Sequence, residues 1–377
     1  MTSDSTVSDQ PRKVIHVLLE VPETNMVLQE FAIPLMEKHE ITICTLYKAA
    51  SHVPEEITLL EGNGTIRGFY RVLRNALRHN VYDIIHAHTP HVALMVLLLV
   101  LPRPRLLRCA IMTIHGSFFN QRWRNKLMLV PVCMFFGRVV CCSKAVFQSF
   151  PGWLRWLAGQ RMCVVPNGVH IRRIQTVRET LKVSPPGSEF TIASVSRMVP
   201  VKNLATTIRA VAETESDHLV FMGDGPLRAT LEHQCCQFSL RDRVRFTGLI
   251  QRNDVYRGMM QSDLFVSTSY SEGLPLAVLE AMACGCPVLL SDIPPHREIA
   301  EGVDFIPLID PNDHVGFARE INRIRQSSKS EREAVGEKCL HLVTERFSLE
   351  RMHRSYEIIL SDVINSKPRE RDACKLS

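Results

Sequence analysis

The sequence lacks an apolar run long enough to cross a membrane. The longest such run, Val92 to Leu101, has about half of the ~20 residues that a spanning helix needs, and Pro102 and Pro104 follow it. The segment before the first apolar run also lacks the charged-then-apolar order of a secretory signal. We therefore expect residues 1–11 to be a flexible lead-in, and we predict no membrane span.

Disulfide chemistry is not indicated either, although the chain has 12 cysteines. They are scattered through a long sequence without any C-x-x-C spacing, whereas disulfide scaffolds are typical of short secreted chains. We predict reduced, mostly buried thiols and a cytoplasmic location.

Acidic residues are nearly absent from one long segment. Between Gly62 and Arg178 there are seventeen Lys or Arg and one acid, Asp83. Four arginines there recur at helical spacing, and further cations flank Trp123 in Arg122-Trp-Arg-Asn-Lys. Basic side chains beside apolar ones suit an anionic membrane surface, so we expect peripheral attachment to the inner face of the cell membrane. The alternative is a solvated basic face without a partner. Nucleic acid is not expected, because no known binding module is present. The four spaced arginines are Arg67, Arg71, Arg74 and Arg78.

Apolar runs rich in β-branched residues alternate with helical patterns in both halves of the chain, which predicts two doubly wound parallel-sheet (Rossmann-like) α/β domains. At 377 residues the chain is long enough for two. The Pro-Pro-Gly at 185–187 is the expected linker. We expect a first domain at 1–184, a second at 185–348, and a C-terminal helix and tail at 349–377. Two such domains would face each other with the carboxyl ends of their sheets toward one cleft. The predicted strands are 14–19, 41–46, 84–88, 110–114, 139–142 and 163–165, then 191–195, 218–222, 244–247, 264–267, 288–291 and 305–308.

A motif with two glutamates carries the strongest chemical signal. The segment from Ser269 to Val288 follows a predicted strand, turns through Gly273 and Pro275, and then continues as an apolar helix containing Glu280. Amides at such a helix start suit a phosphate, and a carboxylate can accept from vicinal hydroxyls. The alternative is that Glu272 caps the helix and Glu280 is solvated on its outer face.

This segment resembles the E-x7-E signature of retaining glycosyltransferases of family 4, which have the GT-B fold, and the resemblance extends from about Val14 to Val363. It implies that Glu280 binds the ribose of a nucleotide and that Glu272 holds hydroxyls of the donor sugar. It also implies donor contacts at Gly273, Leu274 and Pro275. On this resemblance we expect the domain at 1–184 to be the acceptor-side domain and the domain at 185–348 to bind the nucleotide-sugar.

Two cations follow the first strand of the second half, in Ser196-Arg197-Met-Val-Pro-Val-Lys202-Asn203. They resemble the family's pair that neutralises the donor diphosphate, and fixed cations would stabilise the charge that develops on the departing phosphate. The glycines near Gly223 and Gly248 resemble further family landmarks, and main chain at Leu249 and Ile250 is where relatives read the base. Turn formation alone would also explain these glycines.

Histidines mark the first half. His115, at the end of a predicted strand, resembles a family histidine that contacts the donor sugar and phosphate. His86, His88 and His91 offer imidazoles for zinc, but the sequence shows no nearby carboxylate or cysteine, so we predict no metal and no cofactor. Pro166-Asn-Gly-Val also resembles a family landmark, or is a simple turn.

One segment departs from the family pattern, because the loop after the first strand, residues 20–25, has no glycine. It argues against an oxidoreductase, which needs G-x-G-x-x-G there, and it leaves the loop without an assigned role. The resemblance as a whole implies a retaining, metal-independent hexosyltransferase, which we expect to use a UDP- or GDP-sugar and a lipid-linked or saccharide acceptor in cell-surface glycan or glycolipid synthesis. The alternatives are another GT-B enzyme, such as a nucleotide-sugar epimerase or a phosphorylase, or an inactive nucleotide-sugar-binding protein.

Overall fold

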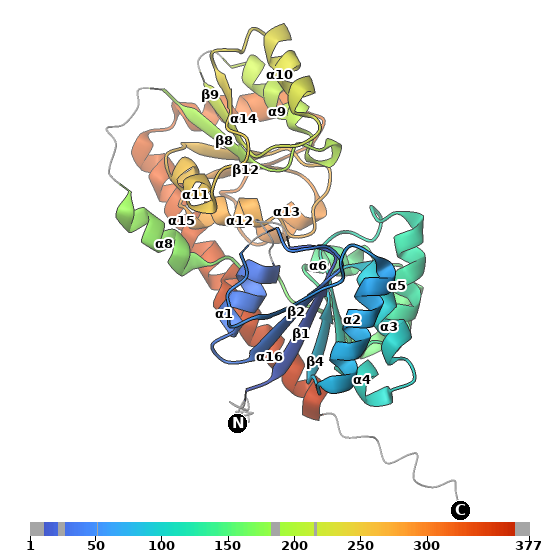
Figure 1. Ribbon diagram of the computed structural model, residues 1–377. Coiled ribbons are helices and arrows are strands. Elements are labelled where there is room, and N and C mark those ends of the chain that lie inside the picture. The colour runs from blue at the N-terminus through green and yellow to red at the C-terminus, as the bar shows by residue number, and fades with distance from the viewer. Residues whose placement is uncertain (1–10, 22–26, 51, 182–188, 215–216, 366–377) are drawn as a thin grey trace, which may run out of the picture. The chain divides into compact units, whose positions relative to one another are not determined.

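A computed structural model describes residues 11–21, 27–50, 52–181, 189–214 and 217–365 (Figure 1). The chain divides into two compact units. The first unit comprises Met1–Cys142, Phe147–Val165 and Met352–Ser377, and the second comprises Ser143–Val146 and Pro166–Arg351. Several predicted segments lie outside the described residues. They are the expected linker at 185–187, the tail from Ser366, residues 1–10 of the expected lead-in, and residues 22–25 of the loop after the first strand. The expected boundary at 184/185 therefore stays a prediction.

The first unit is built on a seven-stranded sheet in which every pairing is parallel, in the order β3-β2-β1-β4-β5-β6-β7. Parallel neighbours need crossover connections, and helices supply most of them. The strands are β1 (Lys13–Leu18), β2 (Glu40–Thr45), β3 (Thr58–Glu61), β4 (Ile84–Ala87), β5 (Ala110–Ile114), β6 (Arg138–Cys141) and β7 (Met162–Val164). The helical segments are η1 (Val27–Ala32, π-helical), α1 (Ile33–Leu35), α2 (Ile66–His79), α3 (Pro90–Val100), α4 (Pro104–Cys109), α5 (Trp123–Phe135), α7 (Gly152–Ala158) and η2 (Gly159–Arg161). Helices α6 (Lys144–Gln148) and α16 (Leu349–Asn365) have residues in both units.

The second unit has a six-stranded parallel sheet in the order β10-β9-β8-β11-β12-β13. Its strands are β8 (Thr191–Val195), β9 (His218–Met222), β10 (Val244–Phe246), β11 (Leu264–Ser267), β12 (Val288–Ser291) and β13 (Leu308–Ile309). Its helices are α8 (Ile171–Thr180), η3 (Pro200–Lys202), α9 (Leu204–Ala212), α10 (Arg228–Gln237), α11 (Arg252–Met260), α12 (Leu276–Ala283), α13 (Pro294–Ile299), α14 (His314–Gln326) and α15 (Lys329–Phe347). The predicted fold class, two doubly wound parallel-sheet units, is confirmed.

Most predicted strands lie within a residue or so of the observed ones, but two predictions fail. The strand expected at 305–308 is only Leu308–Ile309, because Pro307 has no amide hydrogen to donate to a ladder. Strand β3 was not predicted; it is a four-residue edge strand with no fully buried residue, so its sequence shows little of the apolar pattern of the inner strands.

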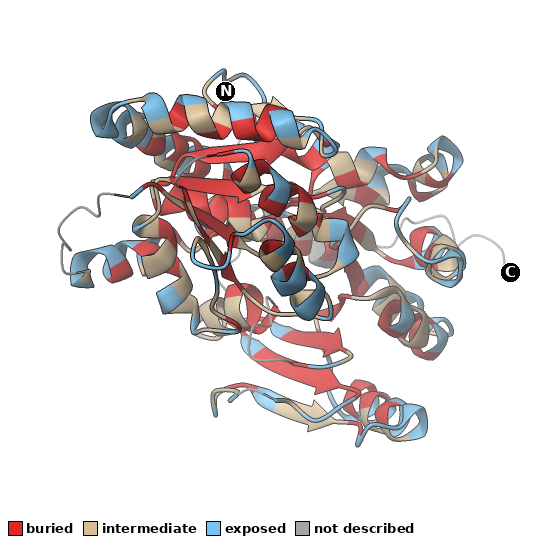
Figure 2. Ribbon diagram, turned by 90° about the horizontal axis from the view of Figure 1, so that it is seen from above, coloured by how far each residue is buried: buried red, intermediate tan, exposed pale blue. Residues whose placement is uncertain are grey.

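Most residues of the inner strands are buried, as the red strands in Figure 2 show, and many of them are apolar. Ile15, Val17 and Ile43 are fully buried in the first unit, and Ile192, Leu219 and Leu264 are fully buried in the second. The cysteines among the described residues are all unpaired thiols and mostly buried.

The C-terminal helix α16 packs on the first unit from Met352 onward. The hydroxyl oxygens of Tyr356 and Thr113 lie 2.8 Å apart, and Arg12 and His39 contact Glu357 at 2.7 and 2.9 Å. Helix α16 therefore contacts the first unit at β5 and at the residues just before β1 and β2.

Each sheet has one point at which the strand order reverses direction. In the first unit this point lies between β1 and β4, and in the second it lies between β8 and β11. Doubly wound folds bind ligands beyond the carboxyl ends of the strands at such a point. The segments that follow these four strands are therefore the places to look for a site.

Candidate functional site

In the second unit, the loops that follow β8 and β11 are joined by Asn203. This residue has a left-handed backbone (φ 51°) and is buried, and its Nδ2 donates to the carbonyls of Thr268 at 3.0 Å and Pro311 at 2.7 Å. The Thr268 hydroxyl donates back to the Asn203 carbonyl at 2.9 Å, and the Tyr270 amide donates to Val201 at 2.9 Å. The two loops are thus held as a single rigid structure at the switch point.

Lys202 and Glu272 meet across these loops. Lys202 Nζ lies 2.7 Å from Glu272 Oε1, and the Ser269 hydroxyl donates to the same oxygen at 2.7 Å. Only 23% of the lysine side chain and 10% of the glutamate side chain are exposed. Partial burial weakens the screening by water, so this ion pair is held in a fixed geometry at the switch point.

Arg197 lies in the same loop and is exposed. The adjacent backbone is in close contact with the loop after β9, since the Met198 amide donates to the Asp224 carbonyl at 2.9 Å. Gly223 has φ 131°, and a Cβ there would lie 2.1 Å from the Ser196 carbonyl oxygen. This approach of two backbones requires glycine, so the Gly223 landmark does more than form a turn.

The turn before α12 leads into a helix start that has no side-chain cap. Leu274 and Pro275 are buried and Gly273 is half-buried, and α12 begins at Leu276. The first amides of a helix have no intrahelical partner and carry the positive end of its dipole. No side chain caps this helix, so the alternative in which Glu272 is its cap is wrong.

Glu280 is buried rather than solvated, with 7% of the residue exposed. Arg252 donates to its Oε1 from Nη2 at 2.6 Å and from Nε at 3.1 Å. The fully buried Tyr256 donates to the same oxygen from its hydroxyl at 2.9 Å. The carboxylate is therefore oriented and held by two side chains of α11.

The backbone at Leu249 and Ile250 follows a positive-φ glycine, Gly248, whose carbonyl accepts from the Gly223 amide at 3.0 Å. Leu249 is 79% exposed and Ile250 is half-buried. Nothing in the structure tests their expected contact with a base, which stays a prediction.

His296 is a site residue that the sequence did not indicate. It is fully buried on α13, and its Nδ1 lies 2.8 Å from the Ser291 carbonyl oxygen. Burial lowers its pKa to about 4, while Glu272 acts to raise the pKa and Lys202 to lower it. The Ser291 hydroxyl donates to the Ser269 carbonyl at 2.6 Å. The imidazole of His296 therefore contacts Ser291, which in turn holds the loop that contains Glu272. The sequence feature that could have indicated His296 is its position shortly after strand β12.

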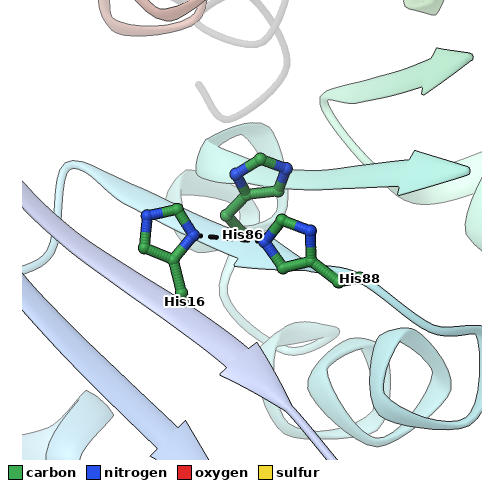
Figure 3. Close-up of side chains that lie close together, drawn as sticks. All are labelled: His16, His86 and His88. Carbon is green, nitrogen blue, oxygen red and sulfur yellow. Dashed lines mark hydrogen bonds between the residues drawn. The ribbon is translucent and has the colours of Figure 1, made fainter. Parts of the chain in front are cut away.

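In the first unit, three buried histidines gather where β1 and β4 pair (Figure 3). Ring nitrogens of His16, His86 and His88 all lie within 4.8 Å of one another. His16 Nδ1 lies 3.1 Å from His88 Nε2, and His86 Nε2 lies 2.7 Å from the Thr113 hydroxyl. His115, after β5, has its Nε2 3.5 Å from His88 Nδ1. Burial lowers the pKa of His16 and His115 to about 4, and the pKa values of His86 and His88 also fall well below 6.5.

A metal is one possible occupant of this histidine cluster, because three neutral imidazoles can bind zinc. The structure supplies His16, which the sequence did not connect with His86 and His88. The cluster contains no carboxylate or thiolate to offset a divalent charge, and one ring nitrogen of each histidine is already used in a contact within the protein. The expectation of no metal stays a prediction.

The surface of the first unit carries the basic helix α2 and several exposed apolar side chains near α5 and α7. The four arginines of α2 are all exposed, while Phe69, Leu73 and Leu77 on its other face are buried, as predicted. Helix α5 packs against α3 and α7. Large apolar side chains on or beside α5 and α7 are exposed, namely Phe119 69%, Trp123 67%, Leu127 61%, Trp153 56% and Trp156 82%. Among the described helices, none has both the length and the apolar composition to span a bilayer.

Comparison with known proteins agrees with this geometry. A family model described as "Glycosyltransferase Family 4" matches residues 25–173, and one described as "Glycosyl transferases group 1" matches residues 178–339. A lipopolysaccharide core biosynthesis glycosyltransferase of Rhizobium meliloti is 35% identical over 147 residues, which is 37% of this chain and 40% of that protein. An Escherichia coli UDP-Gal:alpha-D-GlcNAc-diphosphoundecaprenol alpha-1,3-galactosyltransferase is 23% identical over 327 residues, 82% of each chain.

Solved structures show the same fold. Anabaena HepE, determined with UDP and glucose, has a TM-score of 0.74 at 18% identity, covering 93% of this chain and 100% of that one. Sucrose-phosphate synthase of Thermosynechococcus elongatus has a TM-score of 0.79 at 16% identity, covering 94% and 100%.

Two doubly wound units with this pair of loops at the switch point define a glycosyltransferase of the GT-B fold. The chain belongs to glycosyltransferase family 4. Because the relatives named here are transferases, the alternatives of an epimerase, a phosphorylase or an inactive binding protein are not favoured.

Proposed function

We propose that the protein is a retaining hexosyltransferase that moves a sugar from a UDP- or GDP-sugar to a lipid-linked or saccharide acceptor during synthesis of a cell-surface glycan or glycolipid. The names of the relatives support this proposal, since one acts in lipopolysaccharide core synthesis and another transfers galactose to a diphosphoundecaprenol-linked sugar. A structural neighbour that was solved with UDP and glucose supports a nucleotide-sugar donor.

The contact between Lys202 and Glu272 carries the proposal. A nucleotide-sugar offers a dianionic diphosphate next to a polyhydroxylated ring, and this pair presents a cation and an acceptor 2.7 Å apart. Lys202 and the exposed Arg197 are proposed to bind the phosphates, while Glu272 accepts from hydroxyls of the sugar. The amides near Gly273 would add donors to phosphate. This arrangement needs no divalent metal to neutralise the diphosphate.

The remaining donor contacts follow from the positions of the other residues. Glu280, already oriented by Arg252 and Tyr256, is proposed to bind the ribose hydroxyls. Main chain at Leu249 and Ile250 is proposed to contact the base, and His115 the donor sugar and phosphate.

The proposed reaction retains configuration through front-face attack. The bond from the anomeric carbon to the phosphate oxygen breaks, and a bond from the same carbon to the acceptor oxygen forms on the same face. The departing phosphate takes the acceptor proton, so both atoms and charge balance. Fixed cations aimed at the phosphate stabilise the charge that develops there, and loss of one group that stabilises such charge, an oxyanion-hole donor of a protease, costs about 10²–10³ in kcat.

Sugar transfer by two pairs of variants tests the proposal. Lys202→Met and Glu272→Gln each should lose roughly 10²-fold or more in kcat/KM. Lys329→Met and Glu333→Gln change a matched pair 3.8 Å apart on exposed α15, where both side chains are more than 60% exposed, and should leave the rate unchanged. The measurement is release of UDP or GDP from a panel of nucleotide-sugars. Equal rates in both pairs would disprove the assignment.

We further propose that the first unit attaches to the inner face of an anionic membrane in the cytoplasm. The exposed Trp123 lies between Arg122 and Arg124 in the chain, and the exposed Trp153 and Trp156 lie on α7, which contacts α5. Amphipathic rings with basic side chains are a composition suited to lipid headgroups. A Trp123→Ser/Trp156→Ser variant should bind phosphatidylglycerol vesicles at least about tenfold more weakly. Val315→Ser removes an apolar side chain that is 50% exposed on α14 of the second unit and is the control. Failure of the unaltered protein to sediment with these vesicles at low salt would rule the attachment out.

A further inference from the structure

A chain of hydrogen bonds in the second unit connects the buried His296 to Glu272. His296 Nδ1 lies 2.8 Å from the Ser291 carbonyl oxygen and 3.1 Å from the Ser291 hydroxyl oxygen. The Ser291 hydroxyl donates to the Ser269 carbonyl at 2.6 Å, and the Ser269 hydroxyl donates to Glu272 Oε1 at 2.7 Å. All four residues belong to the second unit, and we call them the serine relay.

The serine relay is buried at its histidine end and reaches the surface at Glu272. His296 and Ser291 are 0% exposed and Ser269 is 2% exposed, whereas 10% of the Glu272 side chain is exposed. Because water does not reach the inner groups, each of them depends on its partner in the relay for hydrogen bonding. Removal of one inner partner would therefore leave a buried polar group unpaired, which costs free energy and favours rearrangement.

The surroundings of His296 select its tautomer. A neutral imidazole has one N–H and one bare nitrogen. The Ser291 carbonyl oxygen can only accept, and the single hydrogen of the Ser291 hydroxyl is directed to Ser269, so His296 Nδ1 is the nitrogen that carries the proton. His296 Nε2 is buried with no hydrogen-bond partner among the described residues, and an unpaired N–H there would be costlier than a bare acceptor. Burial lowers the pKa of His296 to about 4, so the ring is neutral near pH 7.

The proton on His296 Nδ1 determines where the Ser291 hydroxyl points. Because the hydroxyl oxygen faces an N–H donor, its own hydrogen turns away, toward the Ser269 carbonyl. That bond holds the backbone from which the Ser269 hydroxyl reaches Glu272. Ser269 and Lys202 both contact Glu272 at Oε1. Within the described ranges Oε2 has no partner in the protein, so it is the oxygen left to accept from a hydroxyl of a ligand.

We propose that His296 is a positioning residue that acts through Ser291 and Ser269 to fix the Glu272 carboxylate for a hydroxyl of the donor sugar. Because the imidazole is fully buried, it acts through the two serines and not on the sugar itself. The sugar contact rests on the proposed function, whereas the tautomer of His296 is a property of the protein alone. A nucleotide without its sugar lacks the group that Glu272 binds, so its affinity should not depend on the relay.

The first test is NMR of the protein labelled with ¹⁵N-histidine, which distinguishes Nδ1–H from Nε2–H rings and needs no substrate. The signal of His296 is the one that disappears in His296→Asn. We expect this signal to show an Nδ1–H ring at pH 7. An Nε2–H ring or a doubly protonated ring in the unaltered protein overturns the proposal.

The second test measures kcat/KM for the nucleotide-sugar that the protein turns over. His296→Leu removes the Nδ1–H with little change in side-chain size and should lower kcat/KM roughly tenfold, the effect of one lost hydrogen bond. His296→Asn places an amide N–H where Nδ1 lies and should keep kcat/KM within about threefold of the unaltered value. His341→Leu makes the same change at an exposed histidine of α15 and is the control.

Two further readouts separate positioning from a general loss of structure. In the Glu272→Ala background, His296→Leu should cost no additional rate, because the relay then has no carboxylate to position. The Kd of UDP or GDP should be the same in His296→Leu and in the unaltered protein. If His296→Leu does not fold, Ser291→Ala breaks the relay at the next residue and should give the same pattern.

The proposal is overturned by an equal loss of rate in both backgrounds, by weaker nucleotide binding in His296→Leu, or by a His296→Asn variant as slow as His296→Leu. Equal kcat/KM in His296→Leu and His341→Leu also overturns it, while turnover by the unaltered protein would leave the proposed function standing. If the unaltered protein turns over no nucleotide-sugar, the proposed function fails together with the sugar contact, and the NMR result still decides the tautomer.

Discussion

Replacing Tyr256 by phenylalanine removes a single hydroxyl from the group that holds Glu280. In the structure this hydroxyl donates to Glu280 Oε1 at 2.9 Å and accepts from Arg252 Nε at 2.7 Å, and the ring is fully buried. A hydrogen bond to a charged group contributes about 1.5–3 kcal/mol, and the ring shape is unchanged, so Tyr256→Phe should lower the free energy of unfolding by about 2 kcal/mol. The donor KM should also rise, because the carboxylate is less firmly oriented.

Chemical denaturation followed by far-ultraviolet circular dichroism measures this change. Tryptophan fluorescence would not, because Trp123, Trp153 and Trp156 all belong to the first unit. Tyr270→Phe is the matched control: its hydroxyl lies 3.2 Å from the Asn312 side chain, its residue is 48% exposed, and its loss should change the free energy by no more than about 0.5 kcal/mol. Equal effects of the two substitutions would refute the role given to Tyr256.

Three further predictions concern the fold and its response to pH. Gly223→Ala should destabilise the second unit and lower transfer, because its Cβ would lie 2.1 Å from a carbonyl oxygen at φ 131°, whereas Gly152→Ala, with nothing within 4 Å, should be neutral in circular dichroism melts. The hydrogen bond from His39 and the charge of Arg12 hold the pKa of Glu357 below its usual 4.5. The contribution of Glu357 to the free energy of unfolding is therefore present above pH 4.5 and is lost as the pH falls below that value. Glu357→Gln should weaken the fall in stability at acid pH, measured by tryptophan fluorescence. Burial lowers the pKa of His16 and His115 from 6.5 to about 4. The contribution of each residue to the free energy of unfolding is therefore complete above pH 6.5 and is lost toward pH 4 at about 1.4 kcal/mol per pH unit. A free energy of unfolding, followed by fluorescence, that does not change over this range would contradict their burial in neutral form.

The fold could be predicted because its inner strands are buried on both faces. Segments such as Thr191–Val195 and Leu264–Ser267 are short, apolar and rich in β-branched residues, and the structure has strands at these same residues. Strand β3 lacked this signal because it lies at an edge and is half-exposed. The two-residue β13 was misplaced because Pro307 interrupts the apolar run that suggested it.

The candidate site was predictable where one local segment contains the chemistry. Arg197 and Lys202 follow one strand, Glu272 follows its spatial neighbour, and parallel pairing brings the loops together. Partners from distant segments could not be predicted. Arg252 and Tyr256 reach Glu280 from a separate helix, and His16 meets His86 only because β1 and β4 pair in register. These contacts depend on packing and strand register, which no local pattern encodes.

Binding of UDP and GDP by isothermal titration calorimetry tests the central claim most directly, since that claim is that the loops after β8 and β11 hold the donor diphosphate. The account predicts that one of these nucleotides binds the unaltered protein and that the Arg197→Met/Lys202→Met variant binds it at least about tenfold more weakly. Lys329→Met should bind it with unchanged affinity. Equal affinity in the double variant and the unaltered protein, or binding of neither nucleotide, would contradict the account.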